Sequence, residues 1–167
     1  GLTPLSQPTP VSQIQSSSPL PVNSVDLIPQ DGSLEALYQQ VIPGVVSIQV
    51  FTPQGDGLGS GFVYDTQGHV ITNFHVVDGA STVEVDFSSG FKARGTVIGV
   101  DKDSDIAVIK VDAPEAELHP LVLGNSDNLQ VGQTVIAIGN PFGLNGTMTV
   151  GIVSALGRTQ ASEHSID

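Results

Sequence analysis

The chain has 167 residues, no cysteine and a formal net charge of −12, from 17 acidic and five basic side chains. The lack of cysteine excludes thiol catalysis, cysteine-bound zinc and a disulfide framework. Five Lys and Arg cannot form the clustered positive charge that DNA or RNA requires, so we expect no nucleic-acid partner.

Residues 1–32 differ in composition from the rest of the chain. They are rich in Pro, Ser and Gln, contain no Lys or Arg, and show no apolar periodicity. Such a segment buries too little apolar surface to offset its ordering entropy, so we expect an extended tail or linker. No run of 18 apolar residues and no signal peptide is visible, so a membrane link would need a removed or missing N-terminal anchor.

A short helix is predicted next, at the start of a domain expected to cover residues 33–167. Four apolar residues recur at the spacing of one helical face: Leu34, Leu37, Tyr38 and Val41. Ser33 is the expected N-cap, and Pro43 is expected to end the helix.

After Pro43 the pattern is that of β structure. The predicted strands cover residues 45–51, 60–65, 69–77, 82–88, 91–101, 105–111, 133–140 and 147–157. Clusters of Gly, Asp, Asn and Pro separate them, which favours an all-β sandwich or barrel. No helix-period segment lies between the strands, so a parallel βαβ sheet is not expected.

The glycine-rich stretch GDGLGSG, residues 55–61, matches no dinucleotide-binding fingerprint and precedes a strand, so we interpret it as a tight turn. His69, in the turn DTQGH, together with His119 and His164, is expected at the surface. The four histidines show no metal-ligand spacing, so no metal site is predicted.

His75 is the exception among the histidines, because it lies in the apolar run ITNFHVVDGA, residues 71–80. As a strand residue it would share a face with Asn73 and Val77, just before the turn at Asp78. Asp105 stands at the head of a second apolar strand, in a row with Ala107, Ile109 and Val111. A partly buried carboxylate there needs a donor, and an imidazole Nδ1–H would satisfy it while leaving Nε2 to accept a proton.

Two other interpretations of these acids remain open. Asp101, Asp103 and Asp105 match the start of an EF-hand loop, although Ile106 and Asp112 occupy the positions of its Gly and Glu. Asp78 is closer to His75 in sequence, but a separate strand can bring a carboxylate behind the ring more easily, which favours Asp105.

Several motifs together resemble the Deg/HtrA branch of the trypsin-like serine endopeptidases. They are TNFHVV at 72–77, DSDIAVIK at 103–110, GNPFGL at 139–144 and GIVSALGR at 151–158, with GSGFV at 59–63. The resemblance covers roughly residues 33 to 160. It implies a trypsin-like double antiparallel β-barrel, with an incomplete second barrel in this chain.

The resemblance also implies roles and partners. His75 would be the general base, and Asp105 would orient it. Unfolded or damaged proteins would be the substrates, in the periplasm or cell envelope, with no cofactor and with trimers formed through the N-terminal region. A peptide-binding PDZ domain often follows in this family, but no motif here shows one.

The glycine-flanked serine motif GNSGG of these enzymes is missing. None of Ser126, Ser154, Ser162 and Ser165 has that pattern, so we expect the nucleophile beyond Asp167 and an inactive isolated chain. The alternative is a catalytically incomplete fragment or pseudo-protease that binds peptides. A generic β-barrel binding module would place His75 and Asp105 far apart.

Overall fold

A computed structural model describes residues 32–53, 55–140 and 146–157. Helix α1 (Ser33–Val41) and a 3₁₀ turn (Ile42–Gly44) precede the strands. The remaining regular elements, in chain order, are β1 (Val45–Thr52), β2 (Gly55–Val63), β3 (His69–Thr72), α2 (Phe74–Val77), β4 (Thr82–Phe87), β5 (Lys92–Asp101), β6 (Ile106–Val111), β7 (Thr134–Gly139) and β8 (Thr147–Ile152). The expected tail at 1–32 falls almost wholly outside the described residues.

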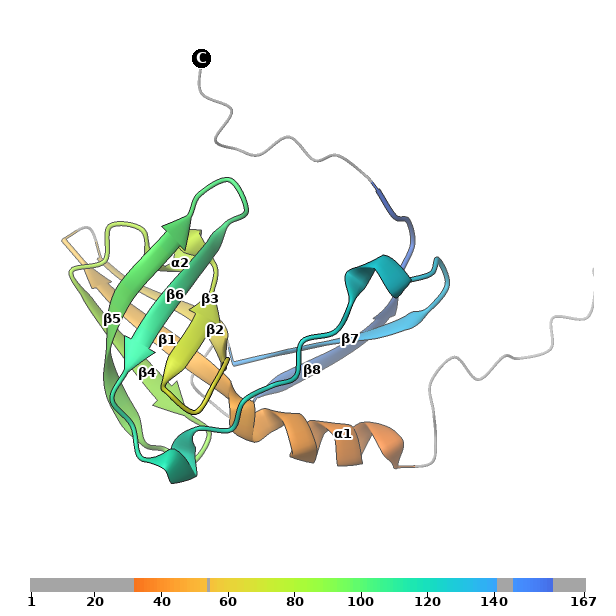
Figure 1. Cartoon of the computed structure of the whole chain (residues 1–167), viewed down its shortest axis with the longest axis horizontal. Coiled ribbons are helices and arrows are strands. Elements are labelled where there is room, and N and C mark those ends of the chain that lie inside the picture. The colour runs from red at the N-terminus through yellow and green to blue at the C-terminus, as the bar shows by residue number, and fades with distance from the viewer. Residues whose placement is uncertain (1–31, 54, 141–145, 158–167) are drawn as a thin grey trace, which may run out of the picture.

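The first six strands form a closed antiparallel barrel in the order β1-β2-β3-β6-β5-β4 (Figure 1). The barrel closes where β1 pairs with β4, from Val46 opposite Phe87 to Phe51 opposite Thr82. Alternate residues of each strand point inward, so Ile48, Val85 and Ile109 are completely buried in one core. The predicted all-β fold class is confirmed.

Strand β2 corrects the prediction of a turn at residues 55–61. All seven residues belong to β2 and pair with β1, from Val46 opposite Gly61 to Thr52 opposite Gly55. A Cβ on Gly61 would lie 2.7 Å from both Ile48 Cδ1 and the carbonyl oxygen of Ile71. Glycine is therefore required by close packing inside the barrel, not by a turn.

Helix α1 is confirmed, but its first residue is not the predicted cap. Gly32, with φ 76°, occupies the N-cap, and Ser33 is the first helical residue. Pro43 lies in the 3₁₀ turn that directly follows the helix. No residue of α1 is fully buried. Leu37 and Val41 instead line an apolar hollow of about 810 Å³ between the helix, the barrel and β7.

Strands β7 and β8 form a separate two-stranded sheet, paired from Thr134 opposite Ile152 to Gly139 opposite Thr147. In Figure 1 this sheet lies beside the barrel and above α1. The N–H of Asn140 donates to Ser60 Oγ at 2.8 Å and so ties the end of β7 to β2. None of the helices in the described ranges combines the length and the apolar character that a membrane crossing needs.

The predicted strand at 69–77 is wrong in its second half. Strand β3 ends at Thr72, opposite Ala107 of β6, and residues Phe74–Val77 form the short helix α2. The partner strand ends because Asp105, just before β6, has a left-handed φ of 53°. The chain after Thr72 therefore loses its ladder partner and turns, and His75 lies on α2 instead of on a strand.

Candidate active site

Asp105 is the centre of a hydrogen-bond cluster that joins α2 to the start of β6. Its backbone carbonyl accepts the N–H of Phe74 at 3.2 Å and the Nδ2–H of Asn73 at 3.0 Å. Its carboxylate Oδ1 accepts the backbone N–H of His75 at 2.9 Å. These donors hold the carboxylate of Asp105 against the first turn of α2.

The imidazole of His75 meets the other carboxylate oxygen. His75 Nδ1 lies 2.7 Å from Asp105 Oδ2, which also accepts from Asn73 Nδ2 at 3.1 Å. The pKa of Asp105 is lowered, first by the backbone N–H of His75 and then by its ring and by Asn73, against an opposing effect of burial. An ionised carboxylate only accepts hydrogen bonds, so Nδ1 carries the proton and Nε2 is left to accept one.

The structure thus brings together the two site residues that the sequence predicts, from different local structures than expected. Asp105 lies in the turn before β6, and its row partners Ala107, Ile109 and Val111 are buried as predicted. The pair itself is more open than expected, since the side chains of His75 and Asp105 are 66% and 42% exposed.

Asn73 is a site residue that the sequence reasoning missed. It is the N-cap of α2, with φ −82° and ψ 148°, but its side chain bonds Asp105 and not the helix. The sequence does hold a signal for it. Asn favours helix N-caps, and Asn73 stands at the end of a strand and directly before an apolar turn.

The calcium alternative receives no support from the acidic turn. Asp101 Oδ1 accepts the N–H groups of Asp103 and Ser104, at 3.0 and 3.3 Å, while Asp105 faces His75. Within residues 32–53, 55–140 and 146–157, no three His, Asp or Glu side chains are grouped to hold a metal ion.

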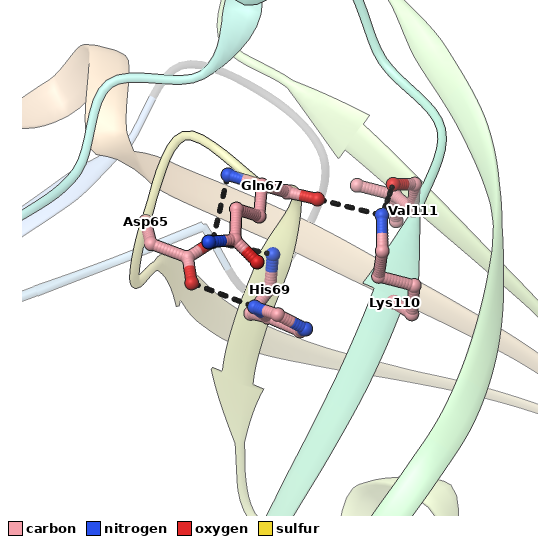
Figure 2. A network of polar contacts seen from close by, with 5 residues as sticks. All are labelled: Asp65, Gln67, His69, Lys110 and Val111. Atoms are coloured by element: carbon pink, nitrogen blue, oxygen red, sulfur yellow. Dashed lines mark hydrogen bonds and ion pairs between the residues drawn. The ribbon is translucent and has the colours of Figure 1, made fainter.

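A second His–Asp pair lies at the other end of β3 (Figure 2). His69 Nδ1 is 2.6 Å from Asp65 Oδ2, and Asp65 Oδ1 accepts the N–H groups of Gln67 and His69. Lys110 Nζ donates to the carbonyl of Gln67 at 2.6 Å, which fastens this turn to β6. The prediction of an exposed turn residue is wrong for His69, which is a strand residue with a side chain only 26% exposed.

None of the other candidates that the structure describes is bonded to the His75–Asp105 pair. His119 is exposed, as predicted, whereas His164, Ser162 and Ser165 fall outside the described residues. Asp78 makes no hydrogen bond to His75. In the described part of the chain no serine hydroxyl is bonded to His75.

An antiparallel β-barrel with a His–Asp pair at one end is characteristic of the trypsin-like serine peptidases, and the matches to known proteins confirm the expected trypsin-like fold class. The family model for the trypsin-like peptidase domain matches residues 59–166. A solved structure titled Deg5 covers 81% of this chain with a TM-score of 0.71 and 39% identity, and this chain covers 69% of it.

Curated relatives show to which branch of the trypsin-like peptidases the chain belongs. The chain is 45% identical over 139 residues to the chloroplastic Protease Do-like 1 of Arabidopsis thaliana, covering 75% of this chain and 31% of that protein. It is 47% identical over 109 residues to a probable periplasmic serine endoprotease DegP-like of Chlamydia trachomatis, covering 65% of this chain and 21% of that protein. The chain belongs to the Deg/HtrA family of trypsin-like peptidases, and it spans about a third or less of the length of these curated relatives.

Proposed function

We propose that the protein is a serine endopeptidase in which His75 is the general base and Asp105 the residue that orients it. The observation that carries this proposal is the 2.7 Å contact between His75 Nδ1 and Asp105 Oδ2 in a chain of the Deg/HtrA family. The nucleophilic serine is expected beyond Asp167. Residues 33–167 then form part of the protease domain, and residues 1–32 form a linker.

The proposed reaction begins when Nε2 of His75 takes the proton of the serine hydroxyl, whose oxygen bonds to the scissile carbonyl carbon. The tetrahedral intermediate collapses as the C–N bond breaks, and Nε2 gives the proton to the leaving amine. Water then attacks the acyl-enzyme ester by the same proton route and restores the serine. Throughout, Asp105 stays ionised and stabilises the imidazolium of His75, in agreement with its lowered pKa.

The proposed substrates are unfolded or damaged proteins, and the proposed assembly is a homotrimer. Support comes from the family and from its named relatives, among which are a chloroplastic protease and a probable periplasmic one. An extracytoplasmic compartment is therefore proposed, in the cell envelope or in an equivalent organelle.

The test uses the protein with its native sequence continued past Asp167. A fluorophosphonate probe should label one serine in the wild type, and His75→Ala should abolish both this labelling and the hydrolysis of unfolded casein. His119→Ala is the matched control, because His119 is exposed and is not part of the cluster. Labelling that persists in His75→Ala would rule out His75 as the base. Peptide binding by an unlabelled wild type would instead support the pseudo-protease alternative.

A further inference from the structure

A hollow of about 380 Å³ adjoins His75 of α2. It lies between α2 and the tip of the β1–β2 hairpin. Its lining includes His75, Val76 and Asp78 from the α2 side and Val50, Asp56 and Leu58 from the hairpin. We call it the His75 hollow. Because the candidate general base forms part of its wall, a substrate bound for hydrolysis must pass beside it.

The more buried part of the His75 hollow, its floor, is apolar, whereas polar groups make up much of the remaining lining. Val50 is 4% exposed, Val76 is half-buried, and Leu58 is 45% exposed. Val76 is held close to the hairpin, since a Cβ on Gly59 would lie 2.6 Å from it. Such a floor suits the methylene stem of a long side chain, which gains from contact with apolar surface.

The rim of the hollow is acidic. Asp56 and Asp78 are both exposed, and neither side chain has a hydrogen-bond or ion-pair partner within the ranges that the structure describes. Asp78 directly follows α2, and Asp56 lies in β2 opposite Phe51 of β1. Two unpartnered carboxylates beside an apolar floor are complementary to a long side chain that ends in a positive charge, such as Lys or Arg.

No described Lys or Arg lines this hollow to neutralise it. Lys92 is bonded to Glu84 and Asp86, at 2.8 and 2.7 Å, and Lys110 to the carbonyls of Gln67 and Val111. Lys102 lies with its Nζ 5.1 Å from the centre of the Phe74 ring. The two carboxylates of the rim are therefore not neutralised by a Lys or Arg of the described lining, and they attract cationic groups to the hollow.

We infer that the His75 hollow is a subsite for a Lys or Arg side chain of the substrate, on the leaving-group side of the scissile bond. The inference rests on the proposed function. His75 delivers its proton to the leaving amine, so the first residues of the departing peptide run past the imidazole. The hollow would hold the stem of one of these residues over Val50 and Val76, with the cation between Asp56 and Asp78.

The experiment measures kcat/KM of the full-length protein on pairs of quenched fluorescent peptides. Each pair carries Lys or its uncharged isostere norleucine at the first or second position after the scissile bond. We expect the wild type to prefer Lys by about tenfold at one of these positions. Asp56→Asn and Asp78→Asn should each reduce that ratio about threefold, and the double variant should bring it close to one.

Asp112→Asn is the matched control. It removes the same charge from an exposed residue, at the end of β6 opposite to Asp105, and should leave the ratio unchanged. Raising the salt concentration should also lower the wild-type ratio by screening.

Two kinds of failure can be distinguished. If neither peptide is cut and no serine is labelled, the proposed function fails and this inference fails with it. If norleucine peptides are cut but the wild type shows no preference for Lys, the subsite is wrong while the protease remains. A preference for Lys that survives unchanged in the double variant overturns the subsite equally.

Discussion

The barrel carries two His–Asp pairs of nearly equal length, and they differ in almost everything else. Asp65 and His69 are four residues apart, at 2.6 Å, with side chains 28% and 26% exposed. His75 and Asp105 are thirty residues apart, at 2.7 Å, with side chains 66% and 42% exposed. A short hydrogen bond between imidazole and carboxylate therefore does not by itself mark a catalytic site.

The surroundings of each ring separate the two pairs. His69 is in the barrel wall, opposite Lys110 of β6, and its pair closes a local turn. His75 projects from α2 and lines the His75 hollow. His75 follows β3 and Asp105 directly precedes β6, so the second pair forms only when these two strands have paired in the barrel.

The largest expected effect comes from replacing each histidine by alanine in a separate variant, because only one of the two pairs should be needed for catalysis. In the full-length protein, His75→Ala should lower kcat for peptide hydrolysis by about 10⁴-fold or more, because the proton acceptor is lost. His69→Ala should keep activity within about twofold and lower the midpoint of thermal unfolding instead. Steady-state kinetics and thermal melts of both variants check this, and equal losses of kcat would refute the distinction.

Gly68→Ala tests the backbone of the turn that carries the Asp65–His69 pair. Gly68 has φ 86°, and an added Cβ would press on the carbonyl oxygen of Val111. We expect a loss of roughly 2 kcal/mol or more in the free energy of unfolding, from the left-handed conformation and the clash. Gly79→Ala is a matched control, since it has φ 71° but nothing within 4 Å of the added Cβ. Urea unfolding should show a clearly smaller loss for the control.

Asn73→Ala tests how tightly the open pair is held. The variant removes both amide bonds to Asp105, so the carboxylate should be less well positioned behind the imidazole. We expect kcat to fall about tenfold with KM nearly unchanged, because the substrate is not contacted. Should KM rise while kcat stays constant, Asn73 would be binding substrate and not positioning Asp105.

The smallest expected effect is on the free energy of unfolding at acid pH, to which both His–Asp pairs contribute in the same direction. The pKa of Asp65 is lowered mainly by the ring of His69, and that of Asp105 mainly by the backbone N–H of His75. The unfolded chain therefore takes up these protons first, near the ordinary Asp value of 3.8. Their contribution is complete above about pH 4 and is lost as the pH falls through the lowered values.

Urea midpoints between about pH 7 and pH 3 check this prediction. Replacing Asp65 and Asp105 by Asn should flatten the acid limb of the stability curve. An acid limb of unchanged slope would mean that other carboxylates cause the loss.

The sequence predicts most of the barrel because burial alternates along its strands. In β4, Val83, Val85 and Phe87 are buried while the residues between them are only partly so, and the alternation of apolar and polar residues in the sequence predicts this pattern. The same reasoning fails at α2, since Phe74–Val77 has the composition of a strand. Only the left-handed turn at Asp105, thirty residues away, ends the ladder there.

The failures at β2 and at the site have a similar cause. Glycine disfavours strands, yet Gly61 is needed where Ile48 and the backbone of Ile71 approach closely. The pairing of His75 with Asp105 could be predicted from the chemistry of a carboxylate that needs a donor. The contribution of Asn73 could not be predicted in this way. It depends on the turn of the chain into α2, whereas the sequence pattern predicts a strand through residue 77.

The most direct test compares the two carboxylates by one conservative change. Asp105→Asn and Asp65→Asn are made in the full-length protein, and the rate of serine labelling by a fluorophosphonate is measured for each at about pH 7. Asp105→Asn should slow labelling by roughly 10⁴-fold, because the amide no longer holds the reactive tautomer of His75, while Asp65→Asn stays within about twofold of the wild type. Equal rates in the two variants would contradict the assignment of Asp105 and His75 to catalysis.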